Sequence, residues 1–198
     1  MLTVKTLDQW VKRSPDGVVL LEGQRDIPAE AALKATQVSA LLALSYPHLR
    51  FRSGNAEGAD AAFSGGVAQV DSQRLQIITP YSGHRKSAQY PGATYVSPED
   101  LSDEQKRMMM ELTVTATPRN AGLVKQADKS GRAGAKAAYL IRDTIKVAGF
   151  SDEFPKPICA LFYVNPTDPM AGGTGHTVRV CEKAGIPTVF QDAWAHWV

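Results

Sequence analysis

Three segments of the chain combine glycine with small polar residues in a way that suits binding of a phosphate group. Each follows a run of aliphatic or β-branched residues and precedes a helical pattern. Glycine lets an anion approach the main chain, and the first N–H groups of a helix attract negative charge. One such turn is common for reasons of turn geometry alone, so the prediction of a phosphate site depends on the three together. Their residues are Gly23, Gln24 and Arg25; Ser53, Gly54, Asn55 and Glu57; and Gly172, Gly173, Thr174, Gly175, His176 and Thr177.

Several polar residues in or near these segments have two interpretations each. Arg25 either binds a phosphate through two guanidinium N–H groups or is a surface cation at a helix start. Asp60 either holds a ribose hydroxyl or stabilises the first turn of a helix. Tyr81, His84 and Arg85 follow a strand end, where they either offer stacking and charge to a ligand or belong to a solvated loop. His176 either donates to a ligand or is hydrogen-bonded to the backbone.

Strand-like and helix-like patterns alternate along the chain. Aliphatic runs bounded by turn residues predict strands, and apolar residues three and four positions apart predict helices. This alternation predicts an α/β fold, a Rossmann-like three-layer sandwich with a mostly parallel sheet, in which ligands bind at the carboxyl ends of the strands. The predicted strands are residues 18–21, 49–52, 75–79, 94–96, 158–164 and 187–190, and the predicted helices are residues 28–46, 59–70, 102–112, 120–127, 133–147 and 177–184.

The apolar residues of these elements mark the surfaces that we expect to be buried. In the first predicted helix, Leu33, Ala40, Leu41 and Leu44 recur at helical spacing and predict the stripe that packs on the sheet. The glycine-rich stretch 165–175 is predicted to be a loop that precedes the last helix. The predicted core contains residues 18–21, Phe51, Ile77 and residues 158–164.

The composition indicates one globular domain, residues 1–198. With 22 Lys and Arg against 20 Asp and Glu, the net charge of +2 is too small for a long-range field to drive tight binding to nucleic acid or an anionic membrane. Cys159 and Cys181 fall in apolar segments and are predicted to be buried free thiols. The four histidines lack partners at metal-ligand spacing, so we predict neither a metal nor a cofactor. No apolar stretch typical of a signal peptide follows Met1, which predicts a cytoplasmic protein.

Residues 53–60, Ser-Gly-Asn-Ala-Glu-Gly-Ala-Asp, resemble the Gly-Ala-Asp signature after the second strand of SLOG proteins. This Rossmann-like superfamily includes lonely-guy phosphoribohydrolases and the DNA-processing protein A family. The segment 172–177, followed by a helix, is similar to the second glycine motif of the superfamily. Arg119 and Asn120 lie in a stretch that resembles the one before the late core strand. The resemblance covers about residues 18–190 and implies a nucleotide or nucleotide-derived ligand, with Arg119 and Asn120 among its contacts.

The chain departs from the lonely-guy pattern at two places. Those enzymes carry Gly-Gly-x-Gly-Thr-x-x-Glu, whose glutamate serves N-glycosidic cleavage, whereas this chain has His176 at the threonine position and Arg179 at the glutamate position. Glu57 and Glu182 are nearby acids, but neither occupies the motif position. In addition, residues 129–157 intervene before the strand 158–164. We interpret this stretch as a helical insertion that covers the pocket or builds an oligomer interface.

Three functions follow from these observations. The leading hypothesis is a non-catalytic sensor or sequestering protein that binds a nucleotide-derived, phosphate-bearing small molecule. The first alternative is an N-glycosidase that resembles a nucleoside monophosphate phosphoribohydrolase, which requires another carboxylate near the leaving base. The second alternative is a single-stranded DNA-binding protein, which the small net charge disfavours. A homodimer is also expected, because related SLOG proteins commonly associate through helices and because the methionines 108–110 offer packing surface.

Overall fold

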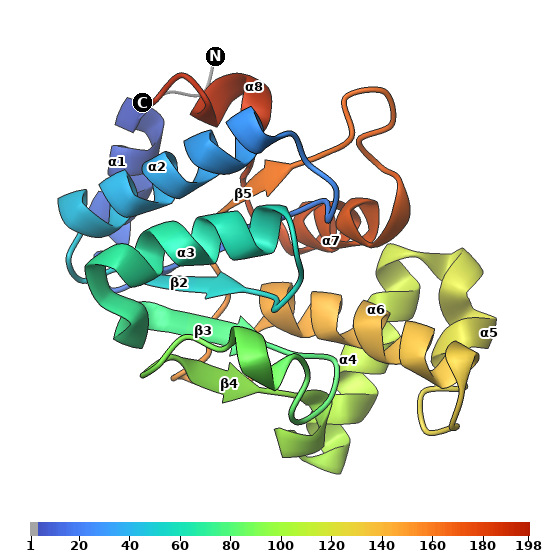
Figure 1. Cartoon of the computed structure of the whole chain (residues 1–198). Helices are drawn as coiled ribbons and strands as arrows, with labels where there is room; N and C mark the ends of the chain where they lie inside the picture. Colours follow the sequence, from blue (N-terminus) through green and yellow to red (C-terminus); the bar gives the residue numbers. More distant parts are fainter. Residues whose placement is uncertain (1–3) are drawn as a thin grey trace.

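The computed structural model describes residues 4–198, which form one six-stranded sheet whose neighbouring strands are all parallel (Figure 1). The strand order is β4-β3-β2-β1-β5-β6. The predicted α/β fold with a mainly parallel sheet is therefore confirmed. The strands are β1 (Val18–Gly23), β2 (Arg50–Ser53), β3 (Leu75–Ile78), β4 (Thr94–Val96), β5 (Cys159–Tyr163) and β6 (Thr188–Phe190).

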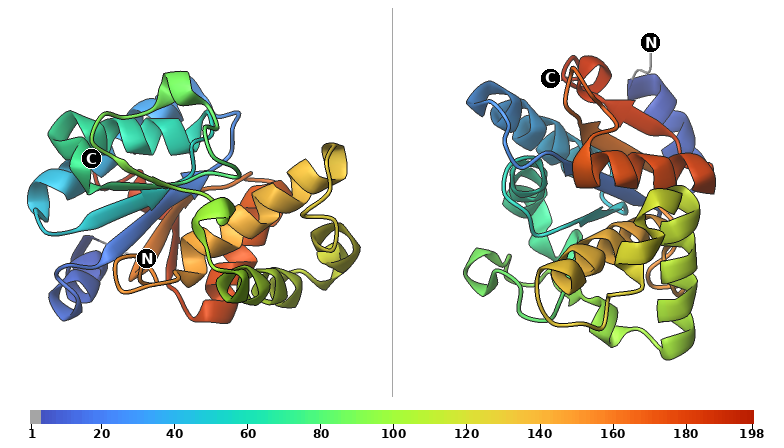
Figure 2. Two further views of the ribbon diagram at one scale, coloured as in Figure 1. Left: turned by 90° about the horizontal axis from the view of Figure 1, so that it is seen from below. Right: turned by 90° about the vertical axis from the view of Figure 1, so that its right-hand side faces the viewer.

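Helices cover both faces of the sheet and make the fold a three-layer sandwich (Figure 2). Side chains of α1, α2, α3 and α8 join the core on one face, and those of α4, α6 and α7 join the core on the other. The short helix α5 packs beside α6. The helices are α1 (Val4–Arg13), α2 (Ala29–Ser45), α3 (Ala59–Asp71), α4 (Asp103–Ala116), α5 (Ala121–Val124), α6 (Arg132–Ala148), α7 (Gly172–Ala184) and α8 (Gln191–Trp194).

The central strand β1 is buried along its whole length because helices cover it on both sides. Successive side chains of a strand point to opposite faces, so Val19 and Leu21 belong to the core under α2 and α3. Leu20 belongs to the core under α6 and α7, and Glu22 lies on that same face. The residue before the end of β1 therefore carries a carboxylate that points toward α6.

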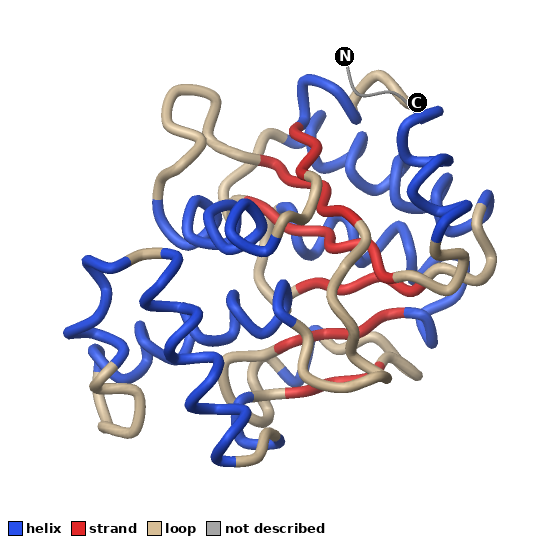
Figure 3. Tube along the Cα trace, turned by 180° about the vertical axis from the view of Figure 1, so that it is seen from behind, coloured by secondary structure: helices blue, strands red, loops and turns tan. Residues whose placement is uncertain are grey.

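Two predictions about helices are wrong. Leu33 and Leu44 of α2 are 58% and 68% exposed, because the helix turns Ala35, Val38 and Leu42 toward the sheet instead. The small residues on that buried side allow α2 to pack closely against α3. The second error concerns the end of the predicted loop 165–175, since α7 begins at Gly172. The loop itself is the long connection that leads from β5 into α7 (Figure 3).

Other predictions about burial are confirmed. Phe51 and Ile77 are fully buried, as are most residues of β5. Cys159 and Cys181 are free and buried, and burial raises the pKa of both thiols. Within residues 4–198, no helix has the length and apolar character that crossing a membrane requires.

Candidate functional site

The strand order places a crevice between the carboxyl ends of β1 and β5. The chain leaves β1 for α2 on one face of the sheet, and it leaves β5 for α7 on the opposite face. Segments that leave neighbouring strands in opposite directions separate and open a crevice, which is where open parallel sheets bind ligands. In this protein the crevice is a pocket of about 880 Å³.

Half of the residues that the sequence suggests as ligand contacts line this pocket. They come from the end of β1, the first turn of α3, the segment before α5 and the first turn of α7. Segments separated by well over a hundred positions are thus brought to one cavity. The residues are Gly23, Gln24, Arg25, Asp60, Arg119, Asn120, Gly172, Gly173 and Thr174.

The turn after β2 and the loop after β3 do not contribute their predicted polar residues to the lining. Ser53 donates to the carbonyl of Leu21, and the Asn55 amide donates to main-chain carbonyls of the loop after β3. Arg85 pairs with Glu57, with 3.2 Å between Nη2 and Oε1. Tyr81, also predicted, lines a separate cavity of about 420 Å³ instead. Asn55, Glu57 and Arg85 therefore join the turn after β2 to the loop after β3.

Gly175, His176 and Thr177, the last three residues of the glycine motif in α7, are buried in the protein. Gly175 lies against the main chain of the preceding loop, where a Cβ would clash. His176 is buried between two threonine hydroxyls from the end of α4 and from α6, and burial lowers its pKa. The Thr177 hydroxyl donates to Glu22 Oε1 at 2.9 Å. Arg179, in the position of the lonely-guy glutamate, donates to the carbonyl of Met170 and does not line the pocket.

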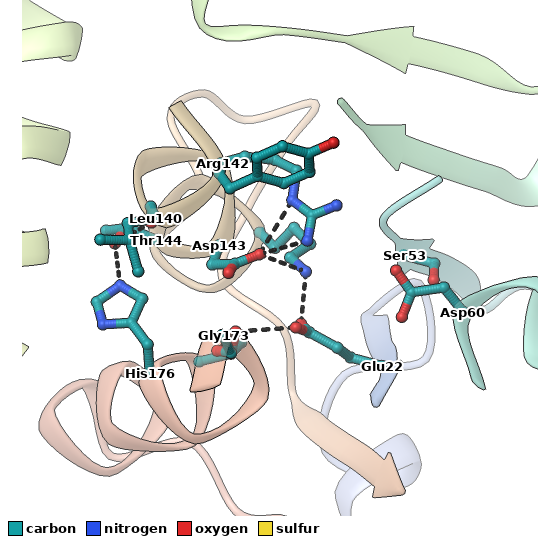
Figure 4. A network of polar contacts seen from close by, with 12 residues as sticks. Glu22, Ser53, Asp60, Leu140, Arg142, Asp143, Thr144, Gly173 and His176 are labelled. Atoms are coloured by element: carbon teal, nitrogen blue, oxygen red, sulfur yellow. Dashed lines mark hydrogen bonds and ion pairs between the residues drawn. The ribbon is translucent and has the colours of Figure 1, made fainter. Parts of the chain in front are cut away.

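A network of buried charges forms the floor of the pocket (Figure 4). Lys146 Nζ lies 2.6 Å from Glu22 Oε2 and 2.9 Å from Asp143 Oδ1. The Arg142 guanidinium donates to the same Asp143 oxygen through Nε at 3.0 Å and Nη2 at 2.6 Å. Asp60 accepts the N–H of Gly23 at 3.2 Å. Three carboxylates and two cations thus share one desolvated space.

The helix predicted at residues 133–147, within the stretch expected to cover the pocket or to build an oligomer interface, is α6, and its Tyr139, Arg142 and Asp143 line the pocket. No sequence pattern singled out these three residues as site residues. Glu22 was missed as well, because it follows four aliphatic residues and reads as the start of a turn. The sequence feature that could have indicated this floor is the charged segment Arg-Asp-Thr-Ile-Lys, residues 142–146, which interrupts the apolar residues of α6.

Burial and mutual attraction set the protonation behaviour of the floor. Burial raises the pKa of Glu22 to about 7, although Lys146 opposes the shift. Burial acts on Asp143 in the same direction, but Arg142 and Lys146 outweigh it and lower the pKa of that carboxyl. Burial and Arg142 would each lower the pKa of Lys146, yet its two carboxylate partners raise it. Asp143 is therefore held ionised, while Glu22 is the floor carboxylate that titrates near neutrality.

Cations at the pocket wall face this acidic floor. The Arg25 guanidinium lies 5.2 Å from the centre of the Tyr139 ring, and the Arg142 guanidinium lies 5.5 Å from it. The Tyr139 hydroxyl is 3.1 Å from Nε2 of His84, which ties the loop after β3 to α6. Arg119 reaches the pocket from the segment before α5. The first turn of α7 has no side-chain cap, so its N–H groups add positive potential.

Comparisons with known proteins do not place the chain in a family. No protein-family model, curated protein or solved structure matches it. Among residues 4–198, no group of three or more His, Cys, Asp or Glu side chains has a geometry that could hold a metal ion.

Proposed function

We propose that the protein binds a nucleotide-derived, phosphate-bearing small molecule in the pocket between β1 and β5, as a non-catalytic sensor or sequestering protein. The observation that carries the proposal is the meeting of Arg25, Arg119 and the uncapped first turn of α7 around one cavity. Guanidinium groups and helix N-termini both favour a phosphate. The cavity volume of about 880 Å³ falls in the range of small-molecule sites.

Gly173 provides a direct test of the phosphate contact. A Cβ at this position would meet only Asp143 Oδ2, at 3.3 Å, so Gly173→Val should fold while narrowing the approach to the first turn of α7. Calorimetry against mono-, di- and cyclic nucleotides and ADP-ribose derivatives should show binding to the unmodified protein and a loss of at least about tenfold in the variant. Gly65→Val is the matched control, because a Cβ at Gly65 meets nothing within 4 Å and lies outside the pocket. Unchanged affinity in Gly173→Val would place the ligand elsewhere.

A second candidate function is cleavage of an N-glycosidic bond in such a nucleotide. Glu22 favours it, because a carboxyl with a pKa of about 7 is able to give or take a proton at neutral pH. Chromatography of the calorimetry samples would reveal a released base. If the base is released by the unmodified protein but not by Glu22→Gln, the enzyme replaces the sensor as the proposed function. If the ligand stays intact after prolonged incubation, the result supports the sensor.

A further inference from the structure

A second cavity, of about 420 Å³, shares α6 as a wall with the pocket between β1 and β5. Gly134, Ala138 and Ile141 line this second cavity, and their spacing of four and three residues places them on one side of the helix. Tyr139 and Asp143 line the first pocket from a different side. The volume of the second cavity lies in the range of small-molecule sites, so it is large enough for a ligand of its own.

Contacts between separate segments hold the walls of this cavity in place. Gly134 lies against the carbonyl of Lys129, where a Cβ would clash, so the loop between α5 and α6 folds over the start of α6. Glu99 accepts the N–H of Ser82 at 3.3 Å, which joins the 3₁₀ turn Pro98–Asp100 to the loop after β3. The cavity is therefore enclosed by α4, α6 and two loops that are fixed to their neighbours.

Most of the lining is apolar, with Met110 of α4 and Ile141 of α6 among the larger side chains. Tyr81, which also lines the cavity, is 45% exposed, and its ring packs edge-on against that of His84 with 5.1 Å between the ring centres. An exposed ring that is held in this way offers a face for stacking. The thioether of Met110 also suits an aromatic neighbour. A ligand with an aromatic body therefore fits this lining best.

Four charged residues line the same cavity without pairing with one another. They are the cations Lys106 and Lys129 and the acids Glu99 and Asp128. Among residues 4–198, none of the four takes part in an ion pair. Glu99 already accepts a main-chain N–H, whereas both ammonium groups lack an acidic partner in the described part of the chain. Two unpaired ammonium groups beside an apolar hollow favour a carboxylate on the ligand, because charged hydrogen bonds are the strong ones.

We infer that this second cavity binds a small aromatic carboxylate, with Tyr81 and Met110 as contacts for its ring and Lys106 and Lys129 as contacts for its carboxylate. The inference does not depend on the proposed function, because the two cavities share no lining residue. The same chemistry is present in an arylalkanoic acid and in an aromatic amino acid. The amino acid carries in addition an ammonium group, for which Asp128 is the unpaired acid of the lining.

The first experiment compares ligands on the unmodified protein by calorimetry. 3-Phenylpropionate and L-phenylalanine each carry a ring and a carboxylate, whereas propionate lacks the ring and phenethylamine lacks the carboxylate. We expect at least one of the first two to bind about tenfold or more tightly than both propionate and phenethylamine. Tighter binding of phenylalanine identifies an amino acid, and tighter binding of 3-phenylpropionate identifies a simple acid. If neither compound exceeds both partial analogues, the inference is wrong.

The second experiment removes the two cations of the cavity. The double variant Lys106→Met with Lys129→Met should bind the tighter aromatic carboxylate about tenfold or more weakly, because the charged hydrogen bonds are lost. The double variant Arg107→Met with Lys125→Met is the matched control, since it removes the same charge from exposed positions outside both cavities. Its affinity should stay within about twofold of the unmodified protein. Equal losses in the two double variants would show that only the overall charge attracts the ligand, and would overturn the site.

The third experiment distinguishes the two cavities and does not require the double variant to fold. Ala135→Phe places a ring in the second cavity from an exposed position of α6, so it should fold and should bind the aromatic carboxylate about fivefold or more weakly. Arg25→Met changes only the first pocket and should leave this affinity within about twofold. Unchanged affinity in Ala135→Phe, or a loss of binding in Arg25→Met, would place the carboxylate outside the second cavity and contradict the inference. Neither result affects the phosphate site, which the nucleotide titrations test separately.

Discussion

The two faces of the sheet are built from different kinds of side chain. The face under α2 and α3 is apolar, with Val19, Leu21 and Phe51 in one continuous core. The face under α6 also buries Arg52, which donates to Gln76 and to the carbonyl of Lys146, beside the charge network of the pocket floor. Buried ion pairs contribute little net stability after their desolvation, whereas apolar burial contributes most of it. The first face therefore contributes mainly apolar burial, and the second uses part of its area to hold buried charges beside the pocket.

The largest effect is expected from removing the cation of the charged face. Lys146→Met leaves Glu22 and Asp143 without their shared partner in a desolvated space, so the free energy of unfolding should fall by about 3–5 kcal/mol. Urea denaturation at pH 7 measures this loss. Lys136→Met on the same helix is the control and should stay within about 0.5 kcal/mol, because Lys136 is exposed. A loss below 1 kcal/mol for Lys146→Met would mean that the network is solvated.

A substitution on the apolar face should lower the free energy of unfolding by a similar or smaller amount, because it opens a cavity. Leu42→Ala opens a cavity between α2 and the sheet and should lower the free energy of unfolding by about 2–5 kcal/mol. Ligand affinity should not change, since Leu42 lies outside the pocket. Leu44→Ala, at an exposed position of the same helix, should cost no more than about 0.5 kcal/mol. Equal losses for the two variants would contradict the orientation of α2.

Glu22, on the face under α6, should make the free energy of unfolding depend on pH near neutrality. Its pKa is about 7 in the folded protein against 4.5 ordinarily, so the folded state binds the proton more tightly than the unfolded chain. The contribution of Glu22 is therefore most favourable below pH 4.5 and declines until about pH 7. The total decline is at most about 3–4 kcal/mol, since a difference of one pKa unit corresponds to about 1.4 kcal/mol.

Comparison with Glu22→Gln isolates this dependence. Burial lowers the pKa of His84 and His176, so their contribution to stability is lost as the pH falls, and this loss is the same in both proteins. Urea denaturation at intervals of about one pH unit measures the difference in the free energy of unfolding between the two proteins. The stability of the unmodified protein relative to Glu22→Gln should decrease from about pH 5 to about pH 7. Parallel curves for the two proteins would show that Glu22 does not carry the shift.

The smallest effect concerns the link between α6 and the loop after β3. Tyr139→Phe removes the hydroxyl that contacts His84 but keeps the ring beside Arg25 and Arg142. The free energy of unfolding should fall by about 1 kcal/mol, and phosphate affinity should change little. Tyr81→Phe is the control at an exposed ring and should have no measurable effect. A large loss of ligand affinity in Tyr139→Phe would assign the hydroxyl to the ligand instead.

Local patterns in the sequence were sufficient for the fold and for part of the site. The aliphatic runs of β1 and β5 and the glycines after them predict buried parallel strands with ligand-binding ends, and Gly23, Arg25 and Gly173 do line the pocket. These features depend on residues a few positions apart, because strand alternation, turn conformation and helix starts are local properties.

Tertiary structure alone decided which side of α2 is buried and which charges meet at the pocket. Leu33 and Leu44 have the correct spacing for a buried stripe, but the close approach of α3 favours the smaller residues on the other side. Glu22 and Thr177 are hydrogen-bonded across 155 positions of the chain. No local pattern specifies that α6 crosses the end of β1, because this placement results from the packing of distant elements. The sequence by itself therefore determined the scaffold and the glycine turns, and the packing of α6 and α7 on the sheet decided the acidic floor.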